Sequence, residues 1–259
     1  MKGELLDAPL TRAARFVAVH GGELERVFCE ALLRELPARA LLDALAARQR
    51  DDGSLEPWRP ADATPEAATR RALAWLGALG LTDHAFPEAA VGFLAAQQAP
   101  DGGWGSPVLP PETRIAITGE TAGLLARTPF ARESLLRRAE AFLARCYSPA
   151  LLQSGEYPPL LGYAHALASL DSEISDEALG WCGRELEKGW RSARFTTAQI
   201  ARVLLRARAK ALPGAQIDAH EVVVSLLGAQ ASDGGWPAEA GSDRVDATLE
   251  AIEALLRLA

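Results

Sequence analysis

The sequence predicts an all-α protein made of repeated helical hairpins, and two observations carry this prediction. Residues 98–104 read Gln-Ala-Pro-Asp-Gly-Gly-Trp, and residues 230–236 repeat them as Gln-Ala-Ser-Asp-Gly-Gly-Trp. Each copy closes one run of apolar residues at helical spacing and precedes another such run. A helix–turn–helix unit that returns along a chain is typical of arrays in which each unit buries its apolar face against its neighbours.

The spacing of the repeats predicts how many units the chain holds. A partial copy over residues 49–53 is followed by Trp58, so the repeat glutamines stand at positions 49, 98 and 230. The intervals between them are 49 and 132 residues, and the second equals three units of 44. We therefore expect two degraded units in between, with helical runs over residues 135–145 and 178–186.

The first helix of each unit is expected to end at its glutamine, as over residues 87–98 and 219–230. Two glycines in succession can supply the positive φ that stops a helix. The aspartate before them can accept hydrogen bonds from nearby backbone N–H groups, and the tryptophan after them offers a large apolar face.

The second helix of each unit is expected to begin at a Thr-x-Glu or Thr-x-Gln pattern. Threonine is a good N-cap, proline suits the first helical position, and an acid in the first turn suits the helix dipole. The four copies start at Thr64, Thr118, Thr197 and Thr248.

Composition excludes several classes of function. The chain has 259 residues, a net charge of -7 and 49% apolar residues, which suits a globular protein and disfavours binding to nucleic acid or to an anionic membrane. No apolar stretch approaches the roughly 18 residues of a membrane span, and acids near the N-terminus interrupt any secretory signal. We therefore expect a cytoplasmic protein with no integral membrane segment.

The cysteines and histidines do not predict a metal site or a cofactor. The three cysteines are scattered, without a Cys-x-x-Cys pair, and are expected to be reduced core thiols. The histidines show no metal-ligand spacing with each other or with a cysteine. These residues are Cys29, Cys146, Cys182, His20, His84, His165 and His220.

Residues 93–105 and 226–236 resemble the QW repeat of squalene–hopene cyclases, other class II terpenoid cyclases and protein prenyltransferase β subunits. The resemblance covers roughly residues 40–259. It implies an (α/α) toroid of five to six hairpins, whose parallel inner helices line a central cavity. On this view residues 1–259 form one domain, with a divergent helix pair in 1–38 and five repeat units in 39–259. Similar toroids occur in complement-type thioester domains and lanthipeptide cyclases, so the fold leaves the function open.

The catalytic motifs of these families are incomplete in this chain. Class II cyclases protonate an alkene with Asp-x-Asp-Asp, and the matching residues here are Arg244-Val-Asp246-Ala, which keep only the central acid. The zinc motifs of prenyltransferases and lanthipeptide cyclases are missing, and so is the Cys-Gly-Glu-Gln of thioester domains. The resemblance therefore implies no metal.

Four residues are candidate acids or bases: Asp246, Asp62, Glu120 and His165. The sequence Asp-Ala-Thr occurs at both Asp62 and Asp246, which favours a structural role at a helix start over a unique proton donor. Glu120 belongs to one of the repeated Thr-x-Glu patterns and can pair with its own helix start. His165 is unique to its unit and could act as a general base near neutral pH, although a lone helical histidine is more often structural.

Five arginines near the starts of the second helices suggest an anion site. Cations there oppose the helix dipole, and a diphosphate or carboxylate above them would relieve this. The alternative is that the chain is simply rich in arginine. The ligand-binding candidates are Arg114, Arg194 and Arg244, with Trp75 and Tyr163 as aromatic walls; Arg59 and Arg191 complete the arginine set.

Two functions remain open. The first is a stand-alone terpenoid-cyclase-like protein that binds an apolar, isoprenoid-like ligand and catalyses proton-initiated cyclisation or isomerisation. The second is a non-catalytic toroid that acts as a carrier or as the partner subunit of another enzyme. Aromatics make up only 6% of residues, which is few for a cavity that guides carbocations and favours the second.

Overall fold

The computed structural model describes residues 2–59, 62–239 and 242–259, and within them it contains 13 α-helices and no strand. The all-α prediction is confirmed. Two compact units are distinguished: unit 1 comprises the described residues of Met1–Asp51, Leu55–Leu81 and Asp218–Ala259, and unit 2 comprises Asp52–Ser54 and Thr82–Ile217.

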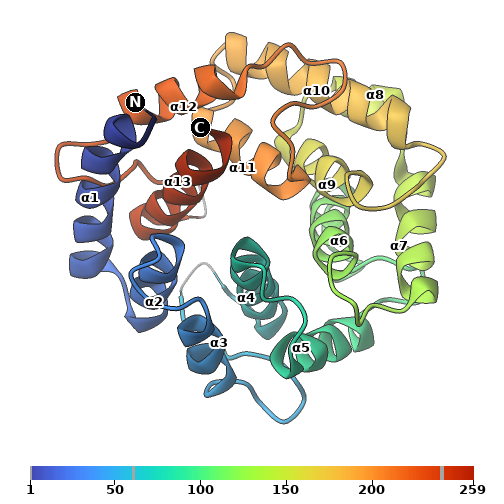
Figure 1. Ribbon diagram of the computed structural model, residues 1–259. Helices are drawn as coiled ribbons and strands as arrows, with labels where there is room; N and C mark the ends of the chain where they lie inside the picture. The colour runs from blue at the N-terminus through green and yellow to red at the C-terminus, as the bar shows by residue number, and fades with distance from the viewer. Residues whose placement is uncertain (1, 60–61, 240–241) are drawn as a thin grey trace. The chain divides into compact units, whose positions relative to one another are not determined.

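Unit 1 joins the two ends of the chain. In it α13 packs against α1, α2 and α12, while α2 also packs against α3 and α4 (Figure 1). The core between these helices is largely leucine, alanine and aromatic. Its helices are α1 (Lys2–His20), α2 (Glu23–Leu32), α3 (Arg39–Ala46), α4 (Pro65–Leu79), α12 (Ala219–Gly228) and α13 (Arg244–Leu258).

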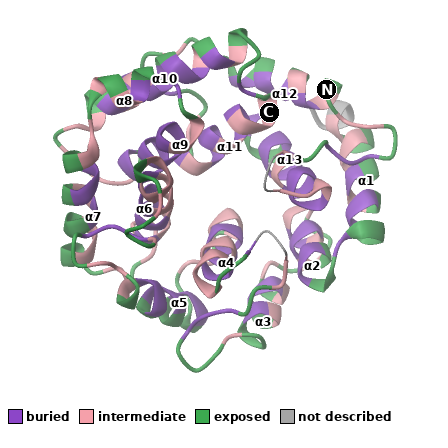
Figure 2. Ribbon diagram, turned by 180° about the vertical axis from the view of Figure 1, so that it is seen from behind, coloured by how far each residue is buried: buried purple, intermediate pink, exposed green. Residues whose placement is uncertain are grey.

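Unit 2 is built around α9. This helix packs against α6, α8, α10 and α11, and it is buried from Pro159 to Leu167 (Figure 2). The runs predicted over residues 135–145 and 178–186 are confirmed as parts of α7 and α10. The helices are α5 (Ala85–Ala96), α6 (Pro111–Leu125), α7 (Glu133–Cys146), α8 (Pro149–Gln153), α9 (Tyr157–Leu167), α10 (Ser175–Arg191) and α11 (Thr197–Ala207).

The two full copies of the repeated turn each fasten the end of one helix to another helix of the same unit. The Gln98 side-chain amide donates to the carbonyl of Gly102 in its own turn and to that of Leu135 on α7. Gln230 donates in the same way to Gly234 and to Pro9 on α1. The predicted hydrogen bonds of the turn aspartates are also confirmed, since Asp101 accepts from the Gly103 N–H and Asp233 from the Gly235 N–H.

Glycine is required in these turns for two reasons. Gly102 and Gly234 have φ of 91° and 93°, a conformation that side chains with a Cβ rarely adopt. A Cβ on Gly102 would also lie 2.2 Å from the Arg138 carbonyl oxygen on α7, and one on Gly234 would lie 2.4 Å from that of Arg12 on α1. The backbone of the turn therefore lies directly against the backbone of α7 or α1.

The predicted starts of the second helices are right at Thr64 and wrong at Thr118 and Thr248. Thr64 caps α4, and Thr196, one residue before the predicted Thr197, caps α11. Thr118 and Thr248 lie inside α6 and α13, where they are buried. Their hydroxyl oxygens accept the backbone N–H of Trp104 and Trp236, so these threonines anchor the turns to α6 and α13.

The partial first repeat follows the same plan with different residues. Thr69, five positions after the predicted Thr64, accepts the backbone N–H of Leu55. Leu55 therefore occupies the place of the repeat tryptophan, and it is fully buried. Trp58, expected in that place, contacts Trp75 instead, at 5.7 Å between ring centroids.

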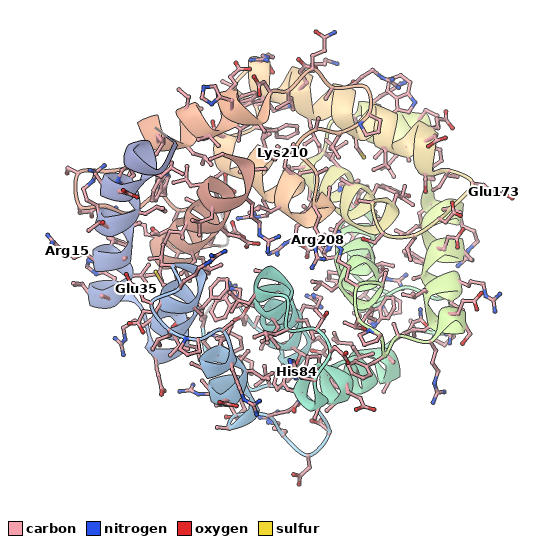
Figure 3. The ribbon with its side chains drawn as sticks, in the orientation of Figure 1. Arg15, Glu35, His84, Glu173, Arg208 and Lys210 are labelled. Carbon is pink, nitrogen blue, oxygen red and sulfur yellow. The ribbon has the colours of Figure 1, made fainter. Side chains whose placement is uncertain are left out.

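Three helices end on residues whose backbone conformation normally favours glycine. Arg34, Ala193 and Arg208 have φ of 63°, 56° and 51°, and the next backbone N–H reaches back five residues to close the helix. Figure 3 labels Arg208 after α11 and Glu35, which directly follows Arg34.

Replacing Ala193 by glycine should stabilise the protein. Ala193 is exposed and loses no contacts, and glycine adopts positive φ without the steric cost of a Cβ, so a gain of about 1 kcal/mol is expected. Urea unfolding measures it. Ala47→Gly is the matched control, because Ala47 is exposed at a helix end with φ of -64° and should show no gain.

None of the helices in the described parts of the chain is both long and apolar enough to cross a membrane.

Candidate functional site

Unit 1 contains a cluster of mostly buried charged side chains, which we call the acid cluster. Two arginines and four carboxylic acids meet here, contributed by α2, α4, α13 and the segments that precede α4 and α13. Charged groups are rarely buried unless they are paired or functional. The members are Glu25, Arg59, Asp62, Arg71, Asp243 and Asp246.

Arg71 on α4 links two of the predicted acids. Its Nε donates to both carboxylate oxygens of Asp62, at 2.8 and 2.9 Å, and its Nη1 donates to Oδ1 of Asp246 on α13 at 2.9 Å. Asp62 and Asp246 are only 3% and 5% exposed. Two residues 184 positions apart in sequence are thus held together by one guanidinium group.

Arg59 forms the second link. Its Nη1 donates to Glu25 on α2 at 2.7 Å, its Nη2 donates to Asp243, and its Nε lies 3.4 Å from Oδ1 of Asp246. Asp243 is also the N-cap of α13, accepting the backbone N–H groups of Val245 and Asp246. Asp246 is therefore not the cap of its helix.

Burial raises the pKa of Asp246 to about 6. Arg71 and Arg59 lower this pKa, while Asp243 and Glu250 raise it. Removal from water is the largest of these effects, and the two arginines compensate it only in part because the cluster holds four carboxyl groups against two guanidinium groups. One carboxyl group without a matching cation favours its protonated form at low dielectric.

Two buried atoms of the cluster lack a hydrogen-bond partner among the described residues. They are Oδ2 of Asp246 and Nε of Arg59. Most buried polar atoms in folded proteins are hydrogen-bonded, so an exception needs an explanation, which can be an ordered water, a ligand or a catalytic role. Oδ2 is the oxygen that can carry the proton of Asp246, since both arginines approach Oδ1.

An aromatic group adjoins the acid cluster. Trp75 lies one helical turn after Arg71 on α4 and stacks on Phe28 of α2 at 4.5 Å. Trp58 contacts Trp75 and donates its Nε1–H to Glu25. Of the predicted site residues, the structure therefore brings together Asp246, Asp62 and Trp75.

The repeat register shows that the acid is unique to the last unit. When the units are aligned on the threonines that anchor the turns, Asp246 matches Ala116 in α6 and Ala67 in α4. Asp62 matches no repeat position that bears an acid. The two Asp-Ala-Thr sequences therefore stand at different positions of the repeat, and among these three units only the last has an acid at the position of Asp246.

Two of the three predicted ligand-binding arginines form ion pairs with the aspartates of the repeated turns. Arg114 pairs with both carboxylate oxygens of Asp101 and lies over the ring of Phe142. Arg244 pairs in the same way with Asp233 and lies over Phe16. These pairs explain how cations are tolerated near the starts of α6 and α13 without a bound anion.

The remaining candidates lie in unit 2 and do not form one site with each other. Arg194 is 40% exposed, lies 3.8 Å from Glu185 and covers the ring of Phe195. Tyr163 is fully buried and donates its hydroxyl to the carbonyl of Leu143. Glu120 is half-buried on α6.

His165 is a predicted site residue whose polar atoms are buried in unit 2. It is completely buried on α9, and neither ring nitrogen has a hydrogen-bond partner among the described residues. Burial, reinforced by Arg127, Arg206 and Arg208, lowers its pKa well below 6.5. A histidine that stays neutral throughout the physiological range is poorly suited to proton transfer at neutral pH.

Replacing His165 by leucine should remove a source of acid instability. The unfolded chain binds a proton at His165 below about pH 6.5 and the folded chain does not, so the wild type loses about 2 kcal/mol of stability between about pH 7.5 and pH 5 through this residue. The difference in unfolding free energy between the two proteins should change by that amount. His220→Gln is the control, because His220 is exposed on α12. If the unfolding free energies of the wild type and His165→Leu change in parallel with pH, the expectation is contradicted.

The cysteines are free, as expected, in the part of the chain that the structure describes. Burial raises the pKa of Cys29 and Cys182 to about 12, which makes both thiols unreactive. Among residues 2–59, 62–239 and 242–259, no three or more His, Cys, Asp or Glu side chains gather so that they could hold a metal ion.

Sequence reasoning missed three members of the acid cluster: Glu25, Arg71 and Asp243. Arg71 had a detectable signal, because it stands two positions after Thr69, where Glu120 and Glu250 follow Thr118 and Thr248. When the first unit is aligned on Thr64 instead of Thr69, Arg71 no longer matches the two glutamates, so the replacement of an acid by a base goes unnoticed. Glu25 carries no such signal.

None of the protein-family models matches the chain, and no curated protein is significantly similar to it in sequence. The likeness to QW-repeat proteins therefore rests on the repeated turns and on the residues that anchor them.

Proposed function

We propose that this protein is a terpenoid-cyclase-like enzyme in which Asp246 donates the proton that starts cyclisation or isomerisation of an isoprenoid. The observation that carries the proposal is the buried Asp246 carboxyl group, whose pKa is raised to about 6 and whose Oδ2 has no hydrogen-bond partner among the described residues. The repeated Gln–Trp turns support the (α/α) toroid that the resemblance implies, in which inner helices such as α4 and α13 line the ligand cavity.

The chemistry needs little beyond this acid. The Asp246 O–H bond breaks as its proton forms a C–H bond with an alkene carbon, which leaves a carboxylate and a carbocation. Closure of a ring or a shift of the double bond ends with loss of a proton, so the overall reaction is an isomerisation. Aromatic faces stabilise cations through their quadrupoles, and Trp75, Trp58 and Phe28 supply such faces beside the acid cluster.

Turnover in heavy water tests the proposal. The wild type is incubated in D2O with a panel of linear isoprenoid hydrocarbons, alcohols and diphosphates, and the products are examined by mass spectrometry. An isomer carrying solvent deuterium is expected. Asp246→Asn should reduce its formation by about 10²–10⁴-fold, the typical contribution of a positioned acid.

Asp43→Asn is the matched control, because Asp43 lies on α3 of the same unit and is exposed. It should turn over substrate like the wild type. An Asp246→Asn protein as active as the wild type, or a wild type that converts no member of the panel, would contradict the proposal.

The alternative is a non-catalytic carrier or partner subunit, and one observation favours it. Unit 1 has an open cleft of about 720 Å³ at the ends of α2, α4 and α13, lined by Leu32, Leu36, Leu79 and Leu256 and by the charged residues Arg34, Glu35 and Arg257. Clefts of this size that combine apolar walls with a few polar groups commonly hold ligands. Native mass spectrometry of the purified protein distinguishes a bound lipid from a bound subunit.

A further inference from the structure

We infer that Asp62 is a positioning residue that sets how tightly Asp246 holds its proton, acting through Arg71. The inference rests on the proposed role of Asp246 and adds a tuning element to that site. Asp62 touches no candidate reacting atom itself, and its carboxylate contacts the guanidinium that contacts Asp246.

The geometry makes Arg71 a shared cation. Both oxygens of Asp62 accept from Nε of Arg71, at 2.8 and 2.9 Å, while a single oxygen of Asp246 accepts from Nη1. Asp62 is only 3% exposed, so water screens this pair poorly. Its negative charge thus opposes the positive charge that Arg71 exerts on Asp246.

The charge of Arg59, the other arginine that faces Asp246, is also shared with further carboxylates. Arg59, from the segment before α4, is paired with Glu25 of α2 and with Asp243. Asp243 and Glu250, both in or next to α13, disfavour a second negative charge at Asp246. Each arginine therefore has another carboxylate partner, and Asp246 is the acid left over.

A purely local role for Asp62 is not supported by the structure of the α4 start. Thr64 already caps this helix, with its hydroxyl accepting the Ala67 N–H at 3.2 Å. The turn that anchors α4 uses Thr69 and Leu55. Asp62 serves neither function, and its side-chain hydrogen bonds are directed at Arg71.

Two substitutions in the Asp62–Arg71 pair should move the pKa of Asp246 in opposite directions. In Asp62→Asn the freed charge of Arg71 favours the carboxylate, so the Asp246 pKa should fall by at least about one pH unit. In Arg71→Gln the cation is gone, so the pKa should rise above that of the wild type. Asp62→Glu keeps the negative charge and should restore most of the wild-type value.

Carboxyl ¹³C NMR of the full chain, labelled at aspartate, follows these titrations, with Asp246→Asn used to assign the signal. Asp43→Asn should leave the Asp246 titration unchanged. An unchanged Asp246 pKa in a folded Asp62→Asn or Arg71→Gln protein would overturn the inference, and either variant suffices if the other does not fold. Because the readout needs no turnover, a protein that shows both shifts but converts no isoprenoid would contradict the proposed function and not this coupling.

Discussion

Replacing Gly119 by alanine is expected to prevent unit 2 from folding stably. Gly119 lies on α6 where this helix crosses α9, and a Cβ there would stand 2.1 Å from the carbonyl oxygen of Gly162 and 2.4 Å from its carbon. The obstacle is backbone, which cannot rotate away as a side chain can. The loss should exceed about 4 kcal/mol, beyond most single substitutions.

The close crossing extends along both helices. A Cβ on Gly123, one turn further along α6, would lie 2.7 Å from the carbonyl oxygen of His165, and one on Gly162 would lie 2.7 Å from that of Ile115. Small residues therefore let two backbones touch over more than one turn. Separating the helices would open the core of unit 2, since α9 also packs against α8, α10 and α11.

Gly92→Ala is the matched control for Gly119→Ala. Gly92 also lies inside a helix, α5, but it is exposed and a Cβ there would meet nothing within 4 Å. Alanine should stabilise that helix by up to about 1 kcal/mol. Urea unfolding compares the two, and a Gly119→Ala protein within about 1 kcal/mol of the wild type would show that the helices cross at a greater distance.

Asp246→Asn is expected to stabilise the protein at neutral pH while removing its proposed acid. The pKa of Asp246 is about 6 in the folded protein against 3.8 for an ordinary aspartate, so the folded state must give up a tightly held proton as pH rises. Ionisation of this residue then costs about 3 kcal/mol at about pH 7.5 and about 1 kcal/mol at about pH 4.5. Asparagine has nothing to ionise.

The stability difference between Asp246→Asn and the wild type should change with pH in a defined direction. The stability advantage of Asp246→Asn over the wild type should grow by about 2 kcal/mol between about pH 4.5 and pH 7.5. If Asp246 were instead an ordinary member of a buried ion pair, removing its charge should cost about 3–5 kcal/mol at neutral pH. Chemical unfolding of both proteins at several pH values separates the two cases, with Asp43→Asn expected to follow the wild type.

Local signals in the sequence predicted most of the helical framework. Apolar residues at helical spacing located α5, α7, α10 and α12, and the Asp-Gly-Gly-Trp turns lie where the repeats predicted them. These features depend on residues a few positions apart, whose spacing is visible in one sequence. The alignment of the second helices with one another was harder to predict. Thr64 caps α4 and Thr69, five positions later, anchors the turn, so one residue type serves two different roles.

The acid cluster could be predicted only in part. Asp246 and Asp62 were recognisable from the Asp-Ala-Thr pattern and from the resemblance, but Arg71 reaches Asp246 through a contact that spans 175 positions in the chain, and Glu25 joins the cluster through Arg59. Arg244, two residues before Asp246, pairs with Asp233 instead of with this carboxyl group. Neighbours in sequence thus differ from neighbours in space where helices from both ends of the chain meet in unit 1.

The most direct test of the central claim is the titration of the Asp246 carboxyl group in the wild-type protein, followed by its ¹³C chemical shift. A proton donor held by burial predicts a pKa of about 6. A carboxyl group that titrates at or below its ordinary value of 3.8 would show that Asp246 is a permanently ionised partner of Arg71 and Arg59, and that result would contradict the account.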